Sequence, residues 1–268
     1  MTLSERYLKY EKCRLDNTNL ISPILHNINT RKQKNQIKTM TAKLFLLPIS
    51  RSILYTDLVK YLDLPVELVY VNKTETGFDN KEFTDNFPLK KFPSYLETSD
   101  NGDVFTLTEM TAIADYLIQK AIADKIPKVD KAVQLGYGSK DTTTDYKTHS
   151  DVLRWISFVT SEYIPQTADV MFMIFGIKKY DEKVAVENAK HSLDYFAEFV
   201  GETLKKQSYL ADPSVPTLAD FAAAIPFYYS VEKGLTDEYK SKHPEIVAWA
   251  KKVFADEFIS ESFKDVKL

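Results

Sequence analysis

Residues 85–96 read DNFPLKKFPSYL, and a second decisive stretch, residues 107–113, reads LTEMTAI. Pro93 stands at the start of an apolar run that is typical of a strand, and a proline there cannot donate to the sheet ladder. A cis bond before Pro93 would make a sharp turn and leave the backbone of Phe92 free to pair with an extended peptide ligand. Glu109 then leads into a helix, whose first N–H groups and dipole favour an anion.

Apolar runs and helical spacing predict further elements around these two stretches. The order is strand, helix, strand, helix, strand, strand, helix, at residues 42–47, 53–62, 66–71, 80–87, 94–98, 104–107 and 110–121. A helix between the first two strands favours a parallel pair, and the turn residues between the last two favour an antiparallel pair. Beyond this region every strong signal is an apolar stripe at helical spacing. The predicted fold class is therefore α/β plus all-α, with a four-stranded mixed sheet followed by a helical bundle.

The composition divides the chain into four expected segments. Residues 1–40 carry eight basic and three acidic residues with weak apolar periodicity, so we expect a basic, disordered extension. Residues 41–121 form the α/β domain, residues 122–148 a linker with some helix at its start, and residues 149–268 the all-helical domain. For residues 1–40 two alternatives stay open, a mitochondrial presequence and a biological start at Met40.

Composition and motifs exclude several functional classes. The 35 basic and 38 acidic residues nearly balance, which argues against a nucleic-acid-binding protein. No apolar run approaches the ~18 residues of a membrane span. The single Cys13 suits a reducing, cytoplasmic location, and the four scattered histidines predict no metal site.

The helical half offers two structural predictions. Residues 217–221 read TLADF, and Thr217 with Asp220 matches a capping box at a helix start. Trp155 lies in an apolar stripe, so its indole ring is expected to be buried.

Together these stretches resemble the glutathione transferase family over residues 42–263. In that family residues 91–93 correspond to the cis-proline element of a thioredoxin-like domain, and residues 107–113 to the entry of its last helix. The Thr217–Asp220 box corresponds to the capped, buried helix of the family's all-helical domain. Residues 85–93, 152–158 and 243–249 resemble in particular the amino-terminal domain of the gamma subunit of translation elongation factor 1. That subunit continues into a further domain, so a chain ending at Leu268 is expected to be a stand-alone form.

The resemblance implies a cis Phe92–Pro93 bond and a set of candidate site residues. Glutathione binding is assigned to Lys91, Phe92, Pro93, Glu109 and Met110. Transferases usually carry a serine at the position of Met110, and without that hydroxyl the binding is expected to be weaker.

The donor that activates the glutathione thiol has two candidate residues. The resemblance assigns it to Ser50, with Ser52 as the alternative, while a serine at that place is equally typical of a helix N-cap. The substrate pocket in the helical domain has Tyr163, Phe172 and Phe175 as candidate lining residues.

Two functions follow from this resemblance. The first is an interaction or dimerisation domain associated with translation elongation, with a second copy or elongation factor subunits as partners. In it glutathione is at most a weak ligand, and no other cofactor is expected. The second is a serine-type glutathione transferase that conjugates glutathione to electrophiles.

Overall fold

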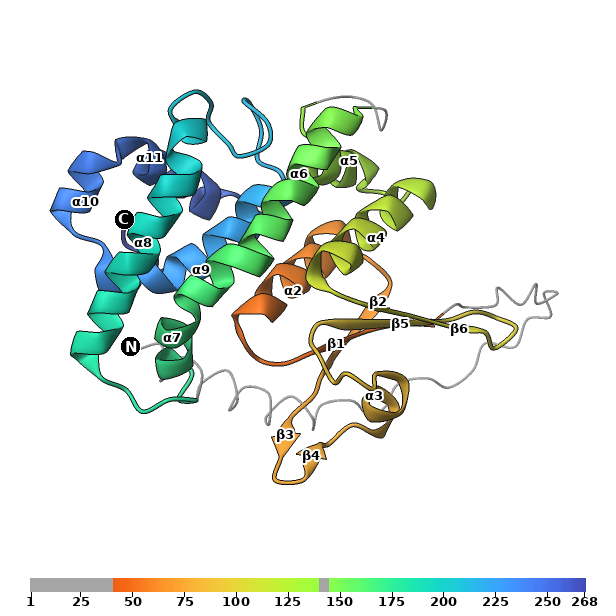
Figure 1. Cartoon of the computed structure of the whole chain (residues 1–268). Helices are drawn as coiled ribbons and strands as arrows, with labels where there is room; N and C mark the ends of the chain where they lie inside the picture. The colour runs from red at the N-terminus through yellow and green to blue at the C-terminus, as the bar shows by residue number, and fades with distance from the viewer. Residues whose placement is uncertain (1–40, 140–144) are drawn as a thin grey trace, which may run out of the picture.

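The computed structural model describes residues 41–139 and 145–268. The predicted disorder of residues 1–40 and the end of the predicted linker, residues 140–144, lie outside this part of the chain. Figure 1 shows the sheet at one end of the molecule, with the helical half packed beside it. The predicted fold class is confirmed by this arrangement.

A four-stranded sheet forms the first half in the order β2-β1-β5-β6. Strand β1 runs parallel to β2 and antiparallel to β5, and β5 runs antiparallel to β6, as the connections predict. A further two-stranded hairpin, β3-β4, was not predicted, because strands of two residues carry no periodic signal. The strands are β1 (Thr41–Leu46), β2 (Val66–Tyr70), β3 (Lys73–Thr74), β4 (Gly77–Phe78), β5 (Ser94–Thr98) and β6 (Val104–Thr108).

Alternate residues of β1 face opposite sides of the sheet, which gives the first half two apolar layers. Leu44 and Leu46 belong to the large core that includes α2 (Ser50–Leu62) and α4 (Met110–Ala123). Phe45 faces the other side and packs with Phe83 of the short helix α3 (Lys81–Asn86). The helices therefore cover both faces of the sheet.

All the regular elements of the second half, residues 145–268, are helices. Its large apolar core continues without a break into the core beneath the sheet. Its elements are α6 (Tyr146–Phe158), the π-helical turn η2 (Val159–Tyr163), α7 (Ile164–Ile174), α8 (Glu182–Leu204), α9 (Leu218–Gly234), α10 (Asp237–Lys242) and α11 (Pro244–Ala255). No helix within the described ranges is long and apolar enough to cross a membrane.

The range predicted as a linker contains a packed helix, α5 (Val129–Tyr137), against α4 and α6. Gly136 lies so close to α4 that a Cβ would stand 2.9 Å from Cγ2 of Ile118. Gly138 follows with φ +69°, in the region that favours glycine. The pair of glycines is thus required by packing and by a helix end, a role that composition does not distinguish from a flexible connection.

Both structural predictions for the helical half are confirmed. Trp155 is 3% exposed, and its Nε1 donates to the carbonyl of Leu210 at 2.9 Å. Thr217 and Asp220 form the capping box at the start of α9, and the Thr217 N–H donates to Oδ2 of Asp220 at 2.9 Å.

Candidate functional site

The Phe92–Pro93 peptide bond is cis, as predicted. It lies just before β5, where Oγ of Ser94 donates to the carbonyl of Lys91 at 2.7 Å. Within the described part of the chain, neither the N–H nor the C=O of Phe92 has a hydrogen bond partner. An extended ligand could therefore pair with this residue at the end of the sheet.

The entry to α4 lies beside this element. The β5-β6 ladder ends at the pair Ser94–Thr108. Pro93, which precedes β5, and Glu109, which follows β6, therefore lie side by side at the same end of these two strands. Glu109 has φ 72° and ψ 130°, a conformation that costs free energy for a residue with a side chain. A strained residue held at a helix start is a feature of functional sites, and it exposes the Glu109 side chain to solvent.

The side chain of Met110, the first residue of α4, points into the protein interior. Its side chain is 8% exposed and belongs to the large core, so no hydroxyl replaces the serine usual in transferases. The carbonyl of Met110 accepts from the hydroxyl of Tyr55 at 2.6 Å, and burial raises the pKa of Tyr55 above its ordinary value. No local pattern could predict this bond, because Tyr55 lies on α2 and Met110 on α4.

The two candidate serines face different surroundings. Ser50 is 5% exposed, and its Oγ donates to Sδ of Met171 at 3.1 Å, across to α7. It is not the N-cap, because Ile49 holds that position and makes no side-chain cap bond. Ser52 lies on another side of α2 and lines a cavity. Ser50 therefore donates into the protein interior.

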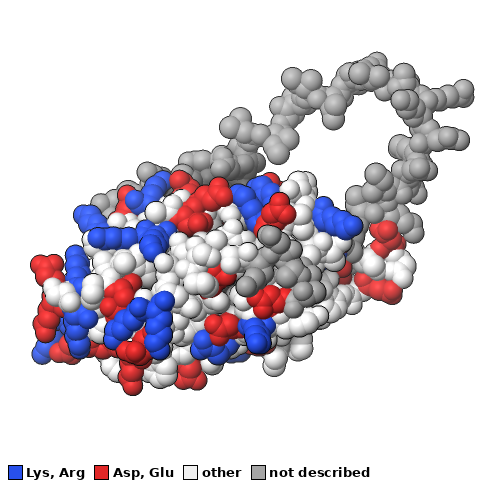
Figure 2. All heavy atoms as spheres, turned by 90° about the horizontal axis from the view of Figure 1, so that it is seen from above, with Lys and Arg blue, Asp and Glu red and all other residues white. Residues whose placement is uncertain are grey.

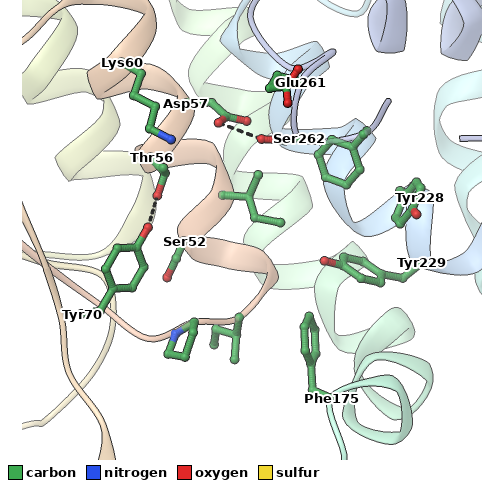
Figure 3. Close-up of a pocket in the computed structure, with 14 residues that line it drawn as sticks. Ser52, Thr56, Asp57, Lys60, Tyr70, Phe175, Tyr228, Tyr229, Glu261 and Ser262 are labelled. Carbon is green, nitrogen blue, oxygen red and sulfur yellow. Dashed lines mark hydrogen bonds between the residues drawn. The ribbon is translucent and has the colours of Figure 1, made fainter. Parts of the chain in front are cut away.

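The cavity has a volume of about 420 Å³, which is the size of a small-molecule site. It lies between α2, the end of β2, the residue that follows α7, the C-terminal half of α9, and the segment that follows α11 (Figure 3). Phe175 is the one member of the predicted pocket residues that lines it. Tyr163 is buried in the core, and Phe172 is exposed on the surface.

Asp57 is the only acidic residue of α2 that lines this cavity, and it is 7% exposed. Its Oδ1 accepts from Oγ of Ser262 at 2.9 Å. Burial raises the pKa of Asp57 to about 6, opposed by the Ser262 hydrogen bond and the nearby charge of Lys60. Sequence reasoning missed Asp57, because its partner lies 205 residues away along the chain.

Metal-binding side chains offer no further site within the described ranges. Among residues 41–139 and 145–268, no three His, Cys, Asp or Glu side chains gather closely enough to hold a metal ion. Lys and Arg are intermixed with Asp and Glu over the face shown in Figure 2.

Known proteins with similar sequences belong to the glutathione transferase and elongation factor 1-gamma groups. A family model for the C-terminal domain of glutathione S-transferase matches residues 163–257. A Saccharomyces cerevisiae protein described as an elongation factor 1 gamma homolog is 30% identical over 218 residues, which cover 81% of this chain and 89% of the relative. Elongation factor 1-gamma 1 of the same yeast is 30% identical over 210 residues, but this chain spans only 46% of it.

A solved structure shows the same arrangement of elements. The crystal structure of the GST-like domain of elongation factor 1-gamma from Saccharomyces cerevisiae superposes with a TM-score of 0.60 at 28% sequence identity. The match covers 85% of this chain and 94% of that one. The chain therefore belongs to the glutathione-transferase-fold family and, within it, to the elongation factor 1-gamma-like proteins.

Proposed function

We propose that this protein is an interaction domain of the translation elongation apparatus, cytoplasmic and with at most slow glutathione transfer. Its partners are elongation factor subunits and a second copy of the chain. The observation that carries the proposal is the Ser50 hydroxyl, which is buried and donates to Met171. The similarity to elongation factor 1-gamma supports a role in translation elongation.

Glutathione transfer requires a thiolate, and a thiol with a pKa near 8.5 needs a donor to stabilise that form at neutral pH. Ser50 offers no such donor while it remains bonded to Met171. What remains is the backbone of Phe92 and the N-terminus of α4 after Glu109, which can bind peptide and carboxylate groups. These remaining binding groups make a serine-type glutathione transferase the second candidate function. Its glutathione-binding residues would be Lys91, Phe92, Pro93, Glu109 and Met110.

We expect glutathione to bind the wild-type chain only weakly, and Met110→Ser to bind it about tenfold more tightly or better. A hydrogen bond to a charged group contributes about 1.5–3 kcal/mol. The Met110 side chain packs inward, but the short side chain of a serine can take a rotamer that turns Oγ toward the start of α4, where it donates to the ligand carboxylate. Isothermal titration calorimetry measures both affinities.

Met110→Ala is the matched control, because it removes the thioether side chain without adding a hydroxyl. Micromolar binding by the wild type, together with fast conjugation of an aromatic electrophile that Ser50→Ala abolishes, would favour the transferase instead.

Affinity purification of the intact chain, with mass spectrometry of the retained proteins, tests the interaction function. Recovery of elongation factor subunits supports it, and their absence while glutathione transfer is fast rejects it.

An aromatic cluster on α6 and α8 suits contact between two copies of the chain. Phe199 is 46% exposed and packs at 5.2 Å from Phe158 and at 4.7 Å from Tyr195, measured between ring centroids. Both partners are half-buried, so all three rings of the cluster are partly exposed. Exposed aromatic surface of this kind is typical of protein interfaces.

We expect Phe199→Asp to convert a dimer into a monomer, because a carboxylate would lose its hydration inside the interface. Light scattering after size-exclusion chromatography measures the molar mass. Ile177→Asp, at an exposed apolar residue of the α7-α8 connection, is the matched control and should remain dimeric. An unchanged mass for Phe199→Asp would place the contact elsewhere.

A further inference from the structure

Strand β6 lies at the edge of the sheet, and no strand of the described residues pairs with its outer side. It is the last strand in the order β2-β1-β5-β6, and the β5-β6 hairpin extends away from the helical half (Figure 1). Its sequence, VFTLT, contains no charged residue and no proline, which commonly protect an edge strand from further pairing. The outer side of β6 can therefore accept another strand.

The register of the hairpin shows which backbone groups face outward. The N–H of Ser99 donates to the carbonyl of Asp103 at 2.9 Å, and every second pair along an antiparallel ladder is bonded in this way. In β6, Phe105 and Leu107 therefore bond to β5. The residues that alternate with them turn their N–H and C=O groups away from β5: Val104, Thr106 and Thr108.

Apolar side chains lie along the same edge. Val104 is 54% exposed and Phe105 is 43% exposed, on opposite faces of the strand. The ring of Phe105 packs at 5.2 Å from that of Tyr116 on α4, measured between centroids, so its position is fixed although it is exposed. Side chains of an added strand would contact their neighbours on β6. The edge thus offers apolar contact as well as hydrogen bonds.

Acidic residues stand at both ends of this strand. Asp103 directly precedes β6 and Glu109 directly follows it, and both are exposed. Lys120 of α4 is itself held by Glu97 at 3.8 Å. Residues 92–119 carry no lysine or arginine and five acidic residues, which are Glu97, Asp100, Asp103, Glu109 and Asp115. This charge pattern is complementary to a basic partner.

The same charges oppose pairing between two copies of the chain. In an antiparallel pair centred on Thr106, Asp103 of one copy would face Glu109 of the other at each end of the new ladder. Like charges directly opposite each other destabilise a pair of strands. A basic residue at each of these places would instead form an ion pair. The charges therefore favour a foreign segment over a second β6.

From these observations we infer that β6 binds an extended segment of a partner polypeptide, with a basic residue at each end of about five uncharged residues. Asp103 and Glu109 are six positions apart, and paired strands have the same rise per residue, so the basic residues need the same spacing. Backbone hydrogen bonds hold the segment, and the charges fix its register. This surface shares only Glu109 with the glutathione-type residues, and the inference does not depend on the proposed function.

Three blocked, fluorescein-labelled peptides test the inference with the full-length chain. KTVTVTK has lysines at the required spacing, ETVTVTE reverses both charges, and KTVPVTK lacks the central N–H that would face Thr106. We expect fluorescence anisotropy at low ionic strength to show KTVTVTK binding about tenfold more tightly than either of the others. The advantage over ETVTVTE should shrink as salt is added.

Amide hydrogen exchange locates the bound peptide. KTVTVTK should slow the exchange of Val104 and Thr106, whose N–H groups face outward. Phe105 and Leu107, already bonded to β5, should change little. Slow exchange of the outward amides before any peptide is added would overturn the inference, because another segment of the chain would then occupy the edge.

Thr106→Pro removes the central outward N–H from the protein itself. Proline is tolerated on an edge strand where its nitrogen faces solvent, so this variant should fold and bind KTVTVTK about tenfold more weakly. Should it fail to fold, Asp103→Lys gives a second test and should reduce the preference for KTVTVTK over ETVTVTE. Asp130→Lys, at an exposed acidic residue of α5, is the matched control and should preserve that preference.

Several results would contradict strand addition by a basic segment. Equal affinities of KTVTVTK and ETVTVTE would remove the role of the charges, and equal affinities of KTVTVTK and KTVPVTK would remove the role of the backbone. Absence of binding at millimolar concentration would overturn the inference altogether. Self-association of the chain that Thr106→Pro abolishes would assign the edge to a second copy instead.

Discussion

Asp220→Ala is expected to lower the free energy of unfolding by about 3–5 kcal/mol, well beyond the ~1 kcal/mol of an ordinary helix cap. The Asp220 carboxylate is fully buried and accepts from three N–H donors. These are the N–H groups of Leu210 and Thr217, at 2.8 and 2.9 Å, and Nε1 of Trp249 at 2.9 Å. Alanine would leave all three without an acceptor, and each buried unpaired donor costs about 1–3 kcal/mol. Chemical denaturation measures the difference.

Asp181→Ala is the matched control for this prediction. Asp181 is the N-cap of α8, exposed to solvent, and its Oδ1 accepts from the Val184 N–H at 3.2 Å. Its replacement should cost about 1 kcal/mol, as expected for an exposed cap. Equal losses for the two variants would mean that the contacts of Asp220 beyond the cap contribute nothing.

The capping box illustrates how far the sequence predicts this structure. Thr217 and Asp220 lie three residues apart, so their contact follows from helix geometry and could be predicted. The bond from Trp249 spans 29 residues and depends on how α11 packs against α9. Local pattern thus identified the cap, and only the tertiary structure shows why the carboxylate is buried.

The sheet was predictable for a similar reason. The apolar run of β1 predicts a buried strand, and the connections predict which strands are parallel; both are local properties. The glutathione-type elements also lie close in sequence, since one hairpin brings Pro93 next to Glu109.

The directions of individual side chains were not predictable. Whether Ser50 faces a ligand or the interior depends on Met171, which lies 121 residues away on α7. The cavity and its carboxylate depend in the same way on the segment that carries Ser262. Helix periodicity assigns a residue to a face of its helix but does not say which distant element covers that face.

Asp212→Ala should have the second largest effect on folding, a loss of about 2–4 kcal/mol in the free energy of unfolding. Asp212 lies in the connection before α9 and is buried. Its Oδ2 accepts from the N–H and Oγ of Ser139, and its Oδ1 accepts from the N–H groups of Ser214 and Val215 and from Oγ of Ser214. The carboxylate thereby joins the end of α5 to this connection.

A Cβ on Gly138 would collide with Oδ2 of Asp212, so Gly138→Ala should also destabilise the chain.

The two buried aspartates should change stability with pH in opposite directions. Hydrogen bonds from Ser139 and Ser214 outweigh burial and lower the pKa of Asp212 from 3.8 to about 2. On acidification the unfolded chain binds this proton first, so the contribution of Asp212 is present above pH 3.8 and is lost as the pH falls toward 2. Burial raises the pKa of Asp220 from 3.8 to about 6, so its contribution is present below pH 3.8 and is lost as the pH rises through 6.

Melting temperatures between pH 2 and 7 separate these two contributions. Asp212→Asn should flatten the loss of stability below pH 4, because it removes the group whose protonation the folded state resists. Asp220→Asn should be least stable relative to the wild type below pH 3.8, and this difference should shrink as the pH rises through 6, because the folded wild type then holds a proton that its unfolded state has lost. Asp100→Asn, in the exposed turn between β5 and β6, is the control and should follow the wild-type curve throughout. Parallel curves for all four proteins would show that neither carboxylate changes its protonation on unfolding, contrary to the roles that their hydrogen bonds and burial assign to them.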